Sequence, residues 1–121
     1  MHTIVFDIGG VLRKQADRGL KRQEETRHYD AIRALYCLCV GSSNWRVFVA
    51  VWLPTKDANV NVVKAELARL KLPPPDGIRI TSSIDSKRSI YAELKPDIVV
   101  DDELSCIDAA VQEGAATLRV R

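Results

Sequence analysis

The sequence predicts an α/β protein whose parallel sheet is covered by helices on both faces. Short apolar runs rich in β-branched residues alternate with segments of helical periodicity along the 121 residues. Glycine, proline or polar residues separate most of these segments. Strands that alternate with helices in this way form parallel sheets joined by right-handed crossovers, so the pattern indicates the fold class directly.

The first half of the chain carries two predicted strands and two predicted helices. Residues 3–6 form an apolar run closed by an aspartate and two glycines, which indicates a buried strand and a turn. Apolar residues recur at helical spacing from Tyr29 to Cys39, and residues 41–44 end that helix. Residues 45–53, WRVFVAVWL, are the longest apolar stretch and are typical of a strand buried on both faces. Residues 60–70 then have the periodicity of a second helix.

The second half continues the alternation. Its elements are a strand over residues 78–80, a helix over 86–94, a strand over 97–100, a helix over 104–111 and a strand over 116–120. Pro96 ends the third helix, and Gly114 caps the fourth. The order β-α-β-α-β-α-β-α-β predicts a three-layer α/β/α sandwich of Rossmann-like type with a five-stranded parallel sheet.

Composition narrows the class of protein. One domain over residues 1–121 accounts for the chain, because the linkers are too short to hold a second. The net charge of +2 does not by itself indicate nucleic acid or a membrane as partner. No apolar run approaches the roughly 20 residues that cross a bilayer, and no basic region precedes the first strand. Cys37 and Cys39 suit reduced thiols near an apolar helix face, so we expect a cytoplasmic protein.

Polar side chains follow four predicted strands at their carboxyl ends, where open parallel sheets bind ligands. These positions are Asp7, Pro54 to Lys56, Thr81 to Ser83, and the pair Asp101 and Asp102. Carboxylates that converge on one edge repel each other unless a cation lies among them, and oxygen ligands suit Mg²⁺. Each aspartate alone could instead cap a turn or a helix, but their conjunction in this strand order favours a site.

Two glycines follow the first aspartate. Gly9 and Gly10 lack side-chain bulk, which would let backbone amides approach an anionic oxygen. The glycine pair therefore predicts a phosphate close to the backbone after Asp7.

Two long segments resemble the motifs of one superfamily. VFDIGGVL is similar to the first motif of the haloacid dehalogenase-like superfamily of aspartate-nucleophile hydrolases, most of which are phosphatases. IDSKRSIYAELKPDIVVDDELSCIDAAVQEGA is similar to the third and fourth motifs. The resemblance implies an Mg²⁺-dependent phosphatase with Asp7 as nucleophile and an aspartyl-phosphate intermediate. It also implies that Lys87 neutralises the nucleophile and the phosphoryl group, and that Asp7, the Gly9 carbonyl, Asp101 and Asp102 hold Mg²⁺.

A further stretch, VWLPTKDAN followed by LKLP, resembles a small capless branch of that superfamily, some of whose members are associated with nucleic-acid repair. The segment after Asp7 is too short for a folded cap, so we expect an open site that admits a large phosphorylated substrate. The basic stretch over residues 13–27 leaves nucleic acid open as a partner, although a solvated helix face explains it more simply. Neither the substrate nor the oligomeric state follows from these residues.

Three positions depart from the superfamily pattern. Gly9 stands where its phosphatases usually carry a second aspartate, a general acid and base. Pro54 occupies the place of a hydroxyl residue, which leaves Thr55, one residue later, as the candidate to hold a phosphoryl oxygen. Cys106 lies near the place of a further acid. These departures predict impaired turnover; the alternatives are a degenerate protein that binds a phosphorylated ligand or partner, and a nucleic-acid end-processing phosphatase.

Overall fold

A computed structural model describes residues 1–14, 22–54, 59–83 and 87–120, with the side chains of the second range from residue 28 onward. The predicted order of elements is confirmed. The elements are β1 (His2–Phe6), α1 (Arg22–Val40), β2 (Trp45–Trp52), α2 (Val60–Arg69), β3 (Gly77–Thr81), α3 (Lys87–Leu94), β4 (Ile98–Asp101), α4 (Leu104–Gln112) and β5 (Ala116–Arg119).

The five strands form one parallel sheet in the order β3-β2-β1-β4-β5. Central strand β1 pairs with β2 on one side and with β4 on the other, so that Val5 lies between Phe48 and Val99. The chain order reverses at β1, and this reversal is the point where open α/β sheets bind ligands. The carboxyl ends of β1 and β4 are therefore neighbours at the predicted site.

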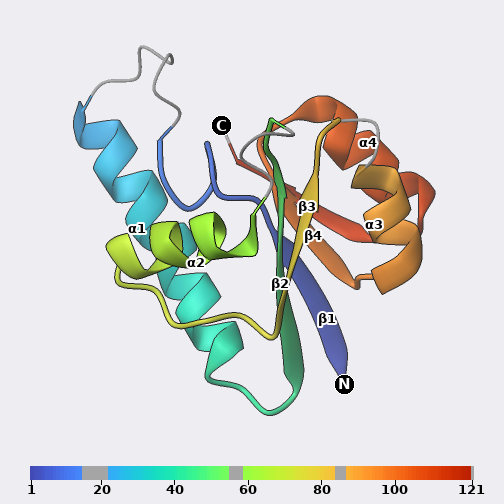
Figure 1. Cartoon of the computed structure of the whole chain (residues 1–121), viewed down its shortest axis with the longest axis horizontal. Helices are drawn as coiled ribbons and strands as arrows, with labels where there is room; N and C mark the ends of the chain where they lie inside the picture. Colours follow the sequence, from blue (N-terminus) through green and yellow to red (C-terminus); the bar gives the residue numbers. More distant parts are fainter. Residues whose placement is uncertain (15–21, 55–58, 84–86, 121) are drawn as a thin grey trace.

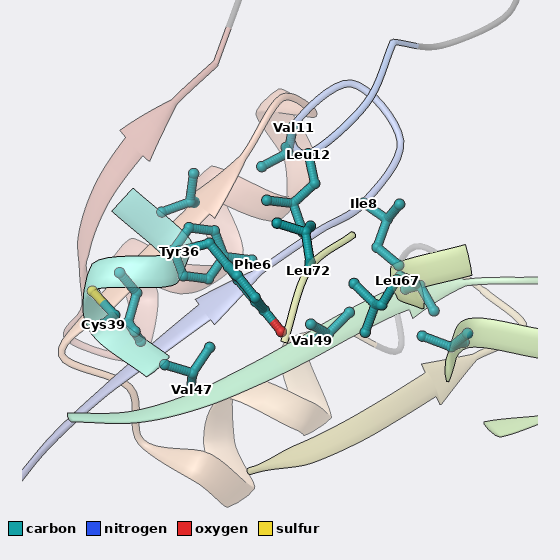
Figure 2. Close-up of a cluster of buried hydrophobic side chains, with 14 of the residues drawn as sticks. Phe6, Ile8, Val11, Leu12, Tyr36, Cys39, Val47, Val49, Leu67 and Leu72 are labelled. Atoms are coloured by element: carbon teal, nitrogen blue, oxygen red, sulfur yellow. The ribbon is translucent and has the colours of Figure 1, made fainter. Parts of the chain in front are cut away.

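Helices cover both faces of the sheet, with α1 and α2 on one side and α3 and α4 on the other (Figure 1). On the α1 and α2 side, the rings of Phe6 and Tyr36 pack edge to face with centroids 5.3 Å apart, among buried aliphatic residues (Figure 2). On the other side, Val5, Val99 and Tyr91 belong to a second buried cluster. Burial on both faces explains why the central strands read as continuous apolar runs.

Three buried side chains anchor the loop after β1 to the hydrophobic core. Ile8, Val11 and Leu12 are at most 4% exposed and insert into the same cluster as Phe6 (Figure 2). The carbonyl of Ile8 accepts hydrogen bonds from the backbone N–H groups of Val11, Leu12 and Arg13. Apolar burial and this compact turn hold the residue just before the loop, Asp7, in a defined place.

The predicted glycine cap at Gly114 is confirmed, and the start of α2 has a side-chain cap. Gly114, just beyond α4, adopts a φ of +86°, which is the left-handed conformation of a glycine cap. The side chain of Asn59 accepts a hydrogen bond from the N–H of Asn61 and caps the start of α2.

Cys37 is exposed and Cys39 is buried, both as free thiols. Among the described helices, none has the length and apolar character needed to cross a bilayer.

Candidate functional site

The predicted convergence of the acidic residues is confirmed. Asp7 directly follows β1, Asp101 is the last residue of β4, and Asp102 follows it. Because Phe6 is opposite Val100 in the parallel pair, both strands deliver their next residues to the same edge. One carboxylate oxygen from each of the three aspartates lies within 4.8 Å of the others.

Lys87, the first residue of α3, lies in contact with these acids. Its side chain is 3% exposed, and its Nζ is 2.8 Å from Oδ2 of Asp101 and 3.5 Å from Oδ1 of Asp7. Burial lowers the pKa of Lys87, but the Asp7 and Asp101 carboxylates outweigh burial and raise it above its ordinary value. The lysine is therefore a fixed cation beside the Asp7 carboxylate.

Asp101 has both of its oxygens engaged. Its Oδ1 accepts hydrogen bonds from the backbone N–H groups of Asp102, at 2.8 Å, and Glu103, at 3.0 Å. Its Oδ2 accepts from Lys87. Asp101 thus holds the turn before α4 and orients the lysine at the same time, whereas the N-cap residue of α4 is Glu103.

The Asp7 carboxyl has a pKa near neutral pH, so its charged and neutral forms are both populated there. Its Oδ1 accepts a hydrogen bond of 2.9 Å from the N–H of Ile8. Burial raises its pKa from 3.8 to about 7, Lys87 acts in the opposite direction, and Asp101 adds to the rise. A positive charge added to the cluster would favour the carboxylate, which is the nucleophilic form.

The structure gives Gly10 a steric role that the sequence did not predict. Its N–H donates to the carbonyl of Arg13 at 2.7 Å, so this amide is already engaged. Its φ is +76°, and a β-carbon there would overlap with the carboxylate of Asp102. Glycine is needed here because the Asp102 side chain occupies the space, and the approach of a phosphate to this backbone stays a prediction. Gly9 does line the cavity described next.

A cavity of about 410 Å³ opens over the acidic cluster. This volume suits a small ligand. Asp7, Lys87 and Asp102 belong to its polar part. Residues 51–54 at the end of β2, with Val62 and Val63 of α2, form an apolar part. Pro54 lines the cavity as the sequence register implies, whereas Thr55 lies outside the described residues and its predicted role stays a prediction.

Cys106 also lines the cavity, near the place where the superfamily carries a further acid. The thiol is 2% exposed, and burial raises its pKa to about 12. The side chain is therefore neutral at ordinary pH and cannot take over the charge of a carboxylate.

Three charged residues that line the cavity, Arg13, Glu66 and Glu103, were not predicted as site residues. Arg13 Nε lies 2.8 Å from Oε1 of Glu66, and Arg69 binds the same carboxylate. The hydrogen bond from Arg69 lowers the pKa of Glu66, and Arg13 contributes to the shift. In the sequence Arg13 begins a basic stretch and Glu66 belongs to the polar face of a helix, so nothing there distinguished them from solvated charges.

Most of the basic stretch over residues 13–27 lies outside the described side chains. A nucleic-acid partner therefore stays a prediction.

The chain is similar in fold to known structures. A universal stress protein in complex with cAMP aligns with a TM-score of 0.54 and 13% identity, over 99% of this chain and 96% of that one. A predicted HAD-like family hydrolase from Porphyromonas gingivalis aligns with a TM-score of 0.49 and 16% identity, over 98% of this chain and 90% of that one. At these identities the likeness concerns the fold alone. No model of a known protein family and no curated protein sequence matches the chain.

Proposed function

We propose that the protein is an Mg²⁺-dependent phosphomonoester hydrolase that works through an aspartyl-phosphate on Asp7. The observation that carries the proposal is the Asp7 carboxylate beside the buried ammonium of Lys87, at 3.5 Å. Both residues also stand at the matching positions of the superfamily motifs that the sequence resembles. An anchored carboxylate next to a fixed cation is what covalent attack on a phosphoryl group requires.

The donor set fits Mg²⁺. Three clustered carboxylates and one ammonium carry a formal charge of −2, which a divalent cation would neutralise. Because the oxygens of Asp101 are engaged by Lys87 and by backbone amides, Asp7 and Asp102 are the side chains best placed to hold the ion. The Gly9 carbonyl would complete the protein ligands. A bound Mg²⁺ would supply charge neutralisation for the phosphoryl oxygens.

The residues of the chain divide the reaction into two displacements. A carboxylate oxygen of Asp7 attacks phosphorus, and the bond to the leaving oxygen breaks with its electron pair. Lys87 offsets the negative charge on the phosphoryl oxygens in both steps. Water then attacks phosphorus and releases Asp7 and inorganic phosphate. Gly9 supplies no proton, so esters with good leaving groups are the expected substrates.

The test is hydrolysis of p-nitrophenyl phosphate with and without Mg²⁺. We expect yellow product with Mg²⁺ and none with a chelator. Asp7→Asn should abolish turnover, whereas Asp108→Asn, on the exposed face of α4, should leave it unchanged. Turnover by Asp7→Asn at the wild-type rate would overturn the proposal, because the nucleophile would then lie elsewhere.

A second candidate is a protein that binds a phosphorylated ligand or partner without turnover. It is favoured by the two positions that lack an acid, Gly9 and the neutral thiol of Cys106. Stabilisation by phosphate or beryllofluoride that depends on Mg²⁺, in a protein that hydrolyses no phosphate ester, would support it. Turnover of any phosphomonoester above the Asp7→Asn level would exclude it.

A further inference from the structure

A guanidinium group belongs to the wall of the cavity, at the end of the loop that follows Asp7. Its residue, Arg13, lines the same cavity as Asp7 and Lys87. The Arg13 N–H donates to the carbonyl of Ile8 at 3.1 Å, and the Arg13 carbonyl accepts from the N–H of Gly10 at 2.7 Å. The side chain is 38% exposed. A ligand in the cavity therefore meets an accessible cation whose backbone is held in place.

Glu66 of α2, the partner of Arg13, is also paired with Arg69. Arg69 donates to both carboxylate oxygens of Glu66, from Nε at 3.0 Å and from Nη2 at 2.7 Å. Arg13 adds its Nε at 2.8 Å from Oε1, an oxygen that Arg69 already contacts. Because the two-point pair with Arg69 is complete without Arg13, this arginine can turn to another anion and leave Glu66 paired.

The Arg13 guanidinium has both hydrogen-bond donors and charge to offer a ligand. Among the described residues, its Nε contacts Glu66 and its Nη1 donates to the carbonyl of Lys14 at 2.9 Å, which engages only part of the donor set of a guanidinium. Two guanidinium groups on one carboxylate give this part of the wall a formal charge of +1. Glu103, the other acid of the cavity, belongs to the turn before α4 and not to this group. The loop and α2 thus form a second place for an anion, beside the cation site of the aspartates.

We propose that Arg13 binds a second anionic group of the substrate, so that the substrate class is a small phosphate monoester that also carries a carboxylate or another phosphate. The inference rests on the proposed function, in which Asp7, Lys87 and Mg²⁺ hold the phosphoryl group that is transferred. A planar guanidinium donates two parallel hydrogen bonds to either kind of anion. Arg13 holds the remote end of the substrate and takes no part in bond breaking.

Binding of inert phosphonates tests the subsite without turnover. The ligands are 3-phosphonopropionate, 4-phosphonobutyrate and 5-phosphonopentanoate, each beside its amide, which has the same shape and no second anion. With Mg²⁺ in excess, calorimetry should show the carboxylate of the best-fitting length binding on the order of tenfold more tightly than its amide. The bisphosphonate of that length identifies the second anion as phosphate if it binds more tightly than the carboxylate, and as carboxylate if it binds less tightly.

Two substitutions should change that preference in opposite directions. Arg13→Gln removes the cation and should abolish the difference between carboxylate and amide. Glu66→Gln removes the anion that competes for Arg13 and should enlarge the difference. Arg79→Gln is the matched control and should leave it unchanged, because Arg79 is 36% exposed, pairs with Glu93 at 3.2 Å and lies outside the cavity. A carboxylate preference that persists in Arg13→Gln would overturn the inference.

Turnover of p-nitrophenyl phosphate separates this inference from the proposed function. If the preference that depends on Arg13 holds in a protein that hydrolyses no phosphomonoester, the hydrolase proposal fails and the anion subsite stands. If turnover occurs but no carboxylate binds more tightly than its amide, the subsite fails and the hydrolase stands. Absence of both turnover and phosphonate binding overturns both.

Discussion

The carboxylate of Asp102 occupies the space that a β-carbon on Gly10 would need. Gly10 also adopts a φ of +76° and donates its N–H to the carbonyl of Arg13. The loop that follows Asp7 is therefore built around the acidic pair of the next strand. Any side chain at residue 10 would displace Asp102 from the cluster or force the loop away from it.

Gly10→Ala should for this reason disturb both stability and metal binding. Gly114→Ala is the matched control, because Gly114 has a φ of +86° and open space around it. Both substitutions carry the cost of a left-handed alanine, about 1–2 kcal/mol. Only Gly10→Ala adds the clash, so it should unfold at lower urea concentration and lose the thermal stabilisation by Mg²⁺ that the proposed function implies. Equal losses in the two variants, with the Mg²⁺ effect intact in both, would contradict this account.

The fold and the convergence of the acids could be predicted because they depend on patterns of sequence neighbours. A strand buried on both faces is an apolar run in the sequence. This pattern predicted a strand over residues 45–53, and β2 spans Trp45–Trp52. Alternation with helices then implied parallel strands, and parallel strands bring their carboxyl ends to one edge. The proximity of Asp7 and Asp101 follows from this topology without knowledge of any side-chain contact.

The remaining features of the site could not be predicted because they depend on side chains far apart in the chain. That both oxygens of Asp101 are engaged depends on the side chain of Lys87 and on the backbone of residues 102 and 103, just before α4. The Gly10 sequence position suggested a phosphate, but the space it leaves is filled by Asp102. The apolar part of the cavity depends on how α2 lies against the end of β2.

Loss of the buried cation should destabilise the fold strongly. Lys87→Met leaves the Asp7 and Asp101 carboxylates without their partner, and breaking a buried pair from one side costs about 3–5 kcal/mol. Urea unfolding should show this loss, and Lys87→Met combined with Asp101→Asn should recover part of it, because fewer unpaired charges remain. Lys64→Met, at an exposed residue of α2, should stay within about 0.5 kcal/mol of wild type. A double variant as unstable as the sum of its single changes would show that the two residues are not coupled.

The raised pKa of Asp7 should make the metal-free protein less stable as the pH rises. The folded protein binds a proton at Asp7 with a pKa of about 7, above the ordinary 3.8, so this group's contribution is fully favourable below pH 4 and is lost by about pH 7. Asn cannot ionise, so Asp7→Asn should be more stable than wild type at pH 8 by about 1–3 kcal/mol, and nearly equal at pH 4.

Urea unfolding in a chelator, from pH 4 to pH 8, measures that difference. Asp108→Asn is again the control and should follow wild type at every pH. A difference between Asp7→Asn and wild type that shrinks as the pH rises would reverse the sign and contradict burial as the main cause of the shift.

Gly9→Asp should restore the missing acid. The glycines with positive φ in the described chain are Gly10 and Gly114, so residue 9 can accept a side chain without left-handed strain. An acid there would protonate the leaving oxygen, and general acids contribute roughly 10²–10⁴-fold. The gain should be large for an alkyl phosphate, whose alkoxide needs the proton, and small for p-nitrophenyl phosphate. Gly9→Asn, with the same shape and no proton to give, should show neither gain. If both substrates accelerate equally, or if Gly9→Asn matches Gly9→Asp, the effect is not proton transfer and the absence of an acid does not limit this site.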